Sequence, residues 1–113
     1  MTVTIYHNPR CSKSRQALEL LRARGAEPRI VEYLNTPPDA AELKRLLKLM
    51  GKRPRDILRP KEAAEAGIDP EALSDDALVA AMVKHPAAIE RPIVVSGGKA
   101  ALGRPPEAVL AVL

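Results

Sequence analysis

The chain has 113 residues, a formal net charge of +4 and 46% hydrophobic side chains, and these values are typical of one globular domain. We therefore expect a single domain over residues 1–113. The longest uncharged apolar run, Ala77–Val83, is far shorter than the ~20 residues that cross a membrane. The first ten residues lack the apolar stretch of a signal peptide, so we expect a cytoplasmic protein. A single cysteine excludes an internal disulfide framework and a Cys-based structural zinc site.

Charge is distributed unevenly along the chain. Residues 1–26 carry a net charge of +4, residues 42–61 carry +6, and residues 62–90 carry −6. The basic segments first suggest a nucleic-acid binder. Only two aromatic residues, Tyr6 and Tyr33, are present to stack on bases, and no helix-turn-helix or zinc pattern occurs. We therefore predict no nucleic-acid partner and a small anionic ligand for the first basic segment.

The N-terminal third predicts a β-α-β unit. Thr2–Tyr6 alternates polar and apolar residues, which is typical of a short strand. A helix is expected to begin at Cys11 or at the next residue and to end at Arg24, followed by Gly25 as its C-terminal cap. Arg29–Leu34 is predicted as a second strand. Because β-α-β crossovers are right-handed, the two strands should be parallel neighbours.

The middle of the chain predicts helices. Thr36 to Asp39, with sequence Thr-Pro-Pro-Asp, resembles a capping box with proline at the first helical position, and Gly51 marks the end of that helix. A second helix is expected over Asp75–Lys84, capped by Ser74. Between the two helices the sequence predicts only short turns.

The C-terminal part returns to strands. Pro92–Ser96 is rich in β-branched residues, and a Gly-Gly pair follows as a hairpin turn signal. Ala100–Gly103 is the expected antiparallel return, and Pro105 opens a last helix. The predicted order is β-α-β, a helical insert, then β-β-α. This order indicates an α/β chain with a small mixed sheet.

Cys11 is the candidate nucleophile. It stands at the predicted start of a helix, where unpaired N–H groups and the helix dipole favour the thiolate. Basic side chains nearby, Arg10, Lys13 and Arg15, should lower the pKa of the thiol further. His7 either adds to this effect as an imidazolium or is an ordinary surface histidine at the end of a strand. We predict a reactive thiol rather than a buried structural one.

Ser14 stands three positions after Cys11, where redox proteins often carry a resolving cysteine. Serine cannot form a disulfide, so an adduct on Cys11 has to be resolved by a thiol from another molecule. The Ser14 hydroxyl could donate a hydrogen bond to the thiolate or to a bound oxyanion. It could also cap the helix, and the two roles are compatible.

Arginine followed by proline occurs four times, at Arg53, Arg59, Arg91 and Arg104. Proline restricts the backbone of the preceding residue, which helps to aim the arginine side chain. Guanidinium groups bind tetrahedral oxyanions through paired hydrogen bonds. Arg91, just before an apolar strand, is the strongest candidate, and Arg53, in an exposed-looking basic turn, is the weakest.

Together these motifs resemble a known family. Residues 7–15, His-Asn-Pro-Arg-Cys-Ser-Lys-Ser-Arg, are similar to the signature of the glutathione/glutaredoxin-dependent arsenate reductase family. Residues 91–95 and 103–105 resemble its later motifs, and Arg59 falls where that family has an arginine. The resemblance covers essentially the whole chain and implies a thioredoxin-like fold with a cis-proline at Pro92. The chain stops at Leu113 without the C-terminal extension of the plasmid-type enzymes, so it resembles a short subgroup.

The resemblance also implies a mechanism. The Cys11 thiolate would attack the arsenic of arsenate, while His7 and Ser14 would tune the thiolate. Glutathione would act as a co-substrate, not as a bound cofactor, and would attack the arsenic adduct. A glutaredoxin would then remove the glutathione and release arsenite. No metal is implied. Three arginines would bind the oxyanion: Arg59, Arg91 and Arg104.

Two other functions remain open at this point. One is a glutathione-dependent thiol oxidoreductase that acts on proteins. The other is a non-enzymatic regulator that binds RNA polymerase, for which the basic residues 42–61 are the supporting feature. The oxyanion arginines favour arsenate over protein disulfides, because a disulfide needs no anion-binding group. Ser14 argues against the regulator, since such relatives often sense redox state through two cysteines.

Overall fold

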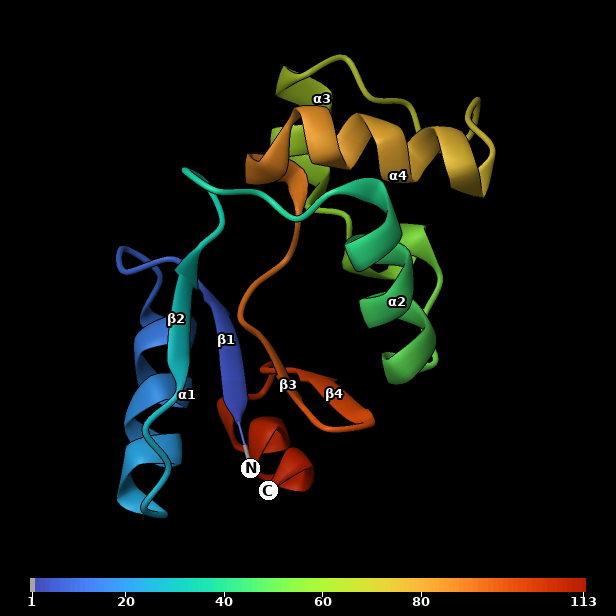
Figure 1. Cartoon of the computed structure of the whole chain (residues 1–113). Helices are drawn as coiled ribbons and strands as arrows, with labels where there is room; N and C mark the ends of the chain where they lie inside the picture. The colour runs from blue at the N-terminus through green and yellow to red at the C-terminus, as the bar shows by residue number, and fades with distance from the viewer. Residues whose placement is uncertain (1) are drawn as a thin grey trace. The chain divides into compact units, whose positions relative to one another are not determined.

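The computed structural model describes residues 2–113, which form two compact units (Figure 1). The first unit comprises residues 2–36 and 91–113, and the second comprises residues 37–90. Among the described residues, all the strands lie in the first unit. None of the helices within residues 2–113 is long and apolar enough to span a membrane. The expectation of one domain over residues 1–113 stays a prediction.

The first unit is a four-stranded mixed sheet in the order β2-β1-β3-β4. β1 and β2 are parallel, whereas β1–β3 and β3–β4 are antiparallel, so the predicted parallel pair and the C-terminal hairpin are confirmed. The elements of this unit, in chain order, are β1 (Val3–His7), α1 (Ser12–Ala23), β2 (Arg29–Glu32), β3 (Ile93–Ser96), β4 (Lys99–Leu102) and the 3₁₀ helix η3 (Pro106–Val112).

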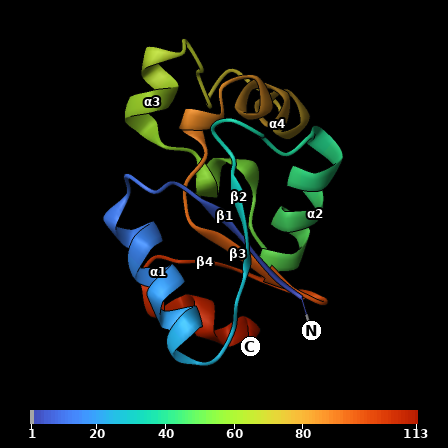
Figure 2. The ribbon, with the colours of Figure 1, turned by 60° about the vertical axis from the view of Figure 1, so that its left-hand side comes forward.

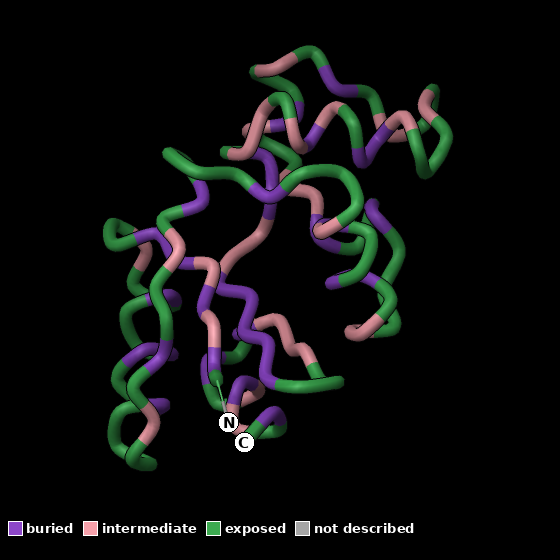
Figure 3. Tube along the Cα trace, in the orientation of Figure 1, coloured by how far each residue is buried: buried purple, intermediate pink, exposed green. Residues whose placement is uncertain are grey.

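One face of this sheet carries the core. α1 and η3 pack against each other on that face (Figure 2). Ile5 and Val94 are register partners on β1 and β3, and both are fully buried. Leu18 and Leu21 of α1, spaced as successive positions on one helix face, cover them. β3 is buried along its whole length, which its β-branched sequence predicted (Figure 3).

The second unit is helical. Its elements are α2 (Ala40–Met50), the 3₁₀ helix η1 (Pro54–Ile57), α3 (Pro60–Glu65), α4 (Asp75–Lys84) and the 3₁₀ helix η2 (Pro86–Ala88). α2 packs against α4. Two exposed ion pairs link the basic and the acidic segments: Lys44 with Asp76 at 3.1 Å and Arg53 with Asp75 at 3.3 Å. The uneven charge of the sequence is therefore partly compensated within this unit, although each exposed pair contributes only about 0–1 kcal/mol.

The predicted cap of α2 at Thr36 is wrong. Asp39 is the N-cap, and its carboxylate accepts the backbone N–H of Glu42 at 2.8 Å. Two consecutive prolines stand just before Asp39 and keep the backbone there extended. The helix therefore begins only at Ala40. The C-terminal cap Gly51, at φ 66°, lies where it was expected.

α3 was missed, and the last helix has a different geometry. Six residues, Pro60–Glu65, are too few to show helical periodicity, so the sequence predicted only a turn there. The C-terminal helix is 3₁₀, and its buried residues Val109 and Val112 are three apart, which matches three residues per turn. The cap of α4 is confirmed, since Ser74 Oγ accepts the N–H of Ala77 at 3.2 Å.

Gly103→Ala should destabilise the protein. A Cβ at position 103 would lie 2.6 Å from Cγ of the Pro92 ring and 3.1 Å from Val109, so the backbone has to shift. Overpacking of this kind costs about 1–3 kcal/mol of the free energy of unfolding, measurable by urea denaturation. Gly98→Ala is the matched control, because nothing lies within 4 Å of its added Cβ. Equal stability of the two variants would contradict this account of the packing.

Candidate active site

Cys11 lies at the junction between β1 and α1. It is the N-cap residue of α1, with φ −93° and ψ 122°, and its N–H donates to the carbonyl oxygen of Asn8 at 3.0 Å. The side chain is half-buried. The thiol therefore stands at the carboxyl end of a strand and at the amino end of a helix, as the sequence predicted.

Two arginines of the same unit contact the thiol. Arg104 Nη2 lies 3.6 Å from Cys11 Sγ, within hydrogen-bonding range for sulfur, and the Arg91 guanidinium also donates to the thiol. Arg104 Nε donates to the backbone carbonyl oxygen of Arg91 at 3.0 Å, so the Arg104 side chain is fixed against the backbone of Arg91. The peptide bonds before Pro92 and Pro105 are both cis.

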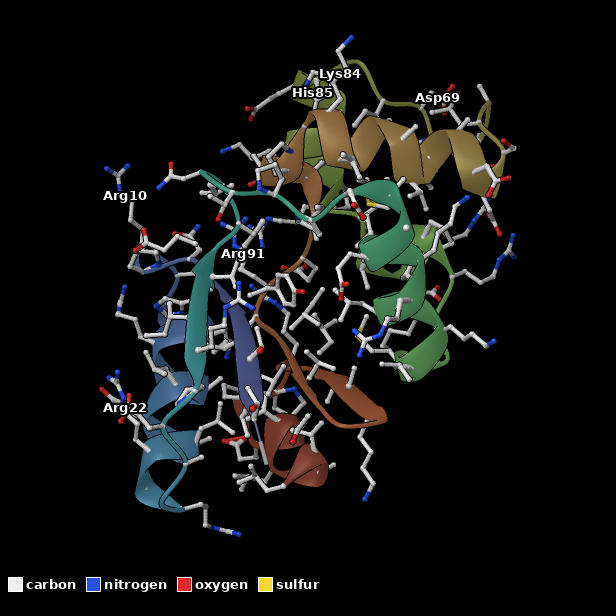
Figure 4. The ribbon with its side chains drawn as sticks, viewed as in Figure 1. Arg10, Arg22, Asp69, Lys84, His85 and Arg91 are labelled. Atoms are coloured by element: carbon white, nitrogen blue, oxygen red, sulfur yellow. The ribbon has the colours of Figure 1, made fainter. Side chains whose placement is uncertain are left out.

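Tyr33 is the residue of this site that the sequence analysis did not identify. Arg91 Nη1 donates to its hydroxyl oxygen at 3.3 Å, and the ring is 1% exposed. Figure 4 labels Arg91 near the end of the sheet at which β2 finishes. The phenol therefore helps to fix the direction of the guanidinium. The one signal in the sequence was that Tyr33 is one of only two aromatic residues.

The pKa of Cys11 lies below its ordinary value. Burial raises it, but the backbone N–H groups of Ser14 and Lys13 and the guanidinium of Arg91 together outweigh burial. The first two are the unpaired donors of the helix terminus, which stabilise the thiolate over the thiol. A lowered thiol pKa at the start of α1 is therefore confirmed.

The positive charge that lowers the pKa of Cys11 comes from a different residue than the sequence predicted. The guanidinium that lowers the pKa of the thiol is that of Arg91, 80 positions along the chain from Cys11, rather than those of Arg10 or Arg15. Arg15 Nη1 donates instead to the carbonyl oxygen of Pro9 at 2.9 Å. Arg10 is exposed, and Figure 4 shows its side chain extending away from the ribbon.

His7 and Ser14 form a buried pair behind the thiol. His7 Nδ1 and Ser14 Oγ are 2.6 Å apart, and the same Oγ accepts the N–H of Asn8 at 3.1 Å. The Ser14 hydroxyl is thus committed to His7 and Asn8. Among residues 2–113 it makes no hydrogen bond to Cys11 Sγ, so the expected bond from this hydroxyl to the thiolate is not formed. Ser14 acts on the thiol through its backbone N–H, which lowers the pKa of Cys11.

His7 is neutral near pH 7, so the imidazolium expected from the sequence is wrong. Burial lowers the pKa of His7, and nearby Arg15 and Arg22 lower it further, against the opposite effect of Glu32. The side chain is 5% exposed. A surface histidine, the other alternative, is excluded by the same burial.

Arg59 belongs to the second unit and is held there by two carboxylates. Its Nη1 lies 2.5 Å from Glu90 Oε1, and its Nε lies 3.2 Å from Glu62 Oε2. Burial lowers the pKa of Arg59, but Glu90 and Glu62 outweigh burial and raise it. Its positive charge is thus compensated locally. Within residues 2–113, no cluster of three or more His, Cys, Asp or Glu side chains could hold a metal ion.

The chain resembles known proteins in both sequence and fold. The sequence profile of the ArsC family matches residues 6–112. The chain is 53% identical to YfgD of Escherichia coli (strain K12), over 98% of this chain and 96% of that protein. It is 50% identical to the arsenate reductase of Neisseria meningitidis serogroup A, over 98% and 97% of the two chains. The solved arsenate reductase from Vibrio cholerae gives a TM-score of 0.93 at 52% identity, covering 100% of this chain and 98% of that one. The expected thioredoxin-like α/β fold is therefore confirmed.

Arg91→Gln should raise the pKa of Cys11. Removing the guanidinium takes away a donor that favours the thiolate, so a larger fraction of the thiol is protonated at a given pH. The rate of alkylation by iodoacetamide, followed against pH, reports the midpoint. Arg15→Gln is the control, since its guanidinium donates to a carbonyl oxygen instead. A larger upward shift with Arg15→Gln than with Arg91→Gln would show that the near neighbours control the thiol.

Proposed function

Because the chain belongs to the ArsC family, we propose that it reduces arsenate to arsenite through a covalent arsenic adduct on Cys11. The observation that carries the proposal is the arginine pair at the thiol, with Arg104 Nη2 3.6 Å from Sγ. A nucleophile that is to attack an anion needs compensating charge at the point of attack. Two guanidinium groups beside a stabilised thiolate supply that charge.

In the first step, the Cys11 thiolate forms a bond to arsenic, and one oxygen of arsenate leaves as water after protonation. Arg91 and Arg104 bind the remaining oxygens and stabilise the negative charge of the transition state. Tyr33 and the carbonyl oxygen of Arg91 keep the two guanidinium groups in place. His7, held neutral by burial, acts on the thiolate indirectly, by fixing Ser14 and with it the first turn of α1.

The second half of the cycle needs thiols from other molecules. Glutathione attacks the adduct and displaces a second oxygen as water. A glutaredoxin thiolate then takes the glutathione sulfur as a mixed disulfide, and the electron pair of the broken As–S bond reduces arsenic from the pentavalent to the trivalent state. Water finally displaces Cys11 and releases arsenite. The basis for this assignment is that Cys11 is the only cysteine and that serine occupies position 14.

Arg59 is the third arginine that the family resemblance assigns to the oxyanion. Its charge is already compensated by Glu62 and Glu90. We therefore assign it the smallest contribution of the three. Arg53, which pairs with Asp75 and is 63% exposed, has no proposed part in the reaction.

Lysine substitution tests the arginine pair. Arg91→Lys and Arg104→Lys keep the positive charge but lose the planar guanidinium group with its paired N–H donors. Each substitution should therefore lower kcat/KM for arsenate, which corresponds to a loss of about 2–4 kcal/mol of transition-state stabilisation. Arg59→Lys should cost less, and Arg53→Lys is the control with the same Arg-Pro context. If Arg53→Lys impairs catalysis as much as Arg104→Lys, the arginine assignment is wrong.

The function itself is tested by arsenate-dependent NADPH oxidation coupled to glutathione, glutaredoxin and glutathione reductase. The wild-type protein should be active in this mixture and inactive with thioredoxin and its reductase alone, because no second cysteine can resolve the adduct. Cys11→Ser should abolish activity while circular dichroism shows an unchanged fold. Activity retained by Cys11→Ser would rule out the covalent mechanism.

A further inference from the structure

A cavity of about 380 Å³ lies in the first unit, outside the carboxyl ends of β1 and β2. Residues 7–10 form one side of it, and Glu32, Leu34 and Asn35 form the other. Ligands of α/β proteins often bind outside the carboxyl ends of parallel strands. The volume falls within the range of about 300–1,000 Å³ that is usual for small-molecule sites. His7, which fixes Ser14, is among the lining residues, but no bond of the proposed reaction described above is made or broken in this cavity.

Both signs of charge line the cavity. Arg10 contributes a guanidinium from the loop after β1, and Glu32 contributes a carboxylate from the end of β2. Within residues 2–113 neither side chain makes an ion pair. Asn8 and Asn35 add side-chain amides, and Leu34, 41% exposed, adds an apolar surface. This lining is suited to a small peptide that carries an ammonium group and carboxylates and is bound through its polar groups.

The cavity adjoins the reactive thiol along the chain. Arg10 is the residue immediately before Cys11, and the N–H of Cys11 donates to the carbonyl oxygen of Asn8 in the cavity wall. Asn8 Oδ1 in turn accepts the N–H of Arg10 at 3.0 Å, which fixes the turn. Cys11 itself is not part of the lining. A ligand held here would therefore lie against residues 8–10, which directly precede Cys11 in the chain.

We propose that this cavity binds glutathione, with Glu32 receiving its ammonium group and Arg10 one of its carboxylates. This assignment of the cavity rests on the proposed function in one respect, namely that glutathione is the co-substrate of the proposed reaction. Glutathione carries one ammonium group, two carboxylates and a thiol at its centre, so binding at the ends leaves the sulfur to approach Cys11. The cavity thus determines which thiol resolves the adduct.

Oxidised glutathione tests the cavity without arsenate. The Cys11 thiolate attacks one sulfur of the disulfide, forms a protein–glutathione mixed disulfide and releases one glutathione thiolate. The second-order rate is followed by mass spectrometry as the addition of one glutathione. The same reaction with bis(2-hydroxyethyl) disulfide, which carries no charge, measures the intrinsic reactivity of the thiol.

Arg10→Gln and Glu32→Gln should each slow the reaction with oxidised glutathione roughly tenfold, the effect of one lost charge-assisted hydrogen bond. Their rates with the uncharged disulfide should stay as in the wild-type protein. Arg29→Gln, at the opposite end of β2, and Glu19→Gln, on α1, make the same changes of charge on exposed positions of the same unit and should leave both rates unchanged.

Three results would overturn the inference. The first is an unchanged rate with oxidised glutathione in both cavity variants. The second is an equal loss with the two disulfides, which would place the effect on the thiol. The third needs no variant: S-methylglutathione, which has no free thiol, should slow the wild-type reaction with oxidised glutathione by competition, and failure to do so would exclude a binding site. If these tests succeed while arsenate is not reduced, the cavity assignment stands and the proposed function fails.

Discussion

The active-site architecture depends on the hydrogen bonding of the turn between β1 and α1. Cys11 takes the N-cap position, where a serine or aspartate oxygen would ordinarily accept the unpaired N–H groups of the helix. Here the Cys11 side chain makes no capping hydrogen bond, and the backbone N–H groups of Lys13 and Ser14 instead favour the ionised form of the thiol. The groups that a helix has to satisfy at its start are therefore the groups that stabilise the nucleophile. The position of Cys11 at the start of α1 is therefore what exposes its thiol to these N–H groups.

The buried polar groups behind this turn keep it rigid. Ser14 Oγ joins His7 to the backbone of Asn8, and Asn8 joins Arg10. The two contacts of Ser14 Oγ are buried, and breaking one would leave a buried polar atom without a partner, at a cost of about 1–3 kcal/mol. The neutral state of His7 belongs to this arrangement, because a buried charge in its place would have to be solvated or paired.

Local sequence patterns were sufficient to predict the features that depend only on neighbouring residues, such as helix caps. The position of Cys11, the Ser74 cap and the Gly51 end of α2 were all predictable, because caps and turns are determined within a few positions. The contact of Arg91 with the thiol, by contrast, joins residues 80 positions apart, through the pairing of β1 with β3. Burial of His7 likewise depends on packing, which no local pattern reports. The cavity beyond β1 and β2 was unpredictable for the same reason.

In the proposed reaction, the environment of Cys11 would also affect the last step. A thiol with a low pKa is a good leaving group, because its sulfur accepts the electron pair of a breaking bond readily. In the last step of the proposed reaction, water would displace Cys11 from trivalent arsenic, and the helix N–H groups and Arg91, which lower the pKa of the thiol, would stabilise the departing thiolate. Thiols bind trivalent arsenic, so a cysteine of ordinary pKa at this position would tend to retain the product. In the proposed reaction, the lowered pKa of Cys11 would therefore favour release of the product over its retention.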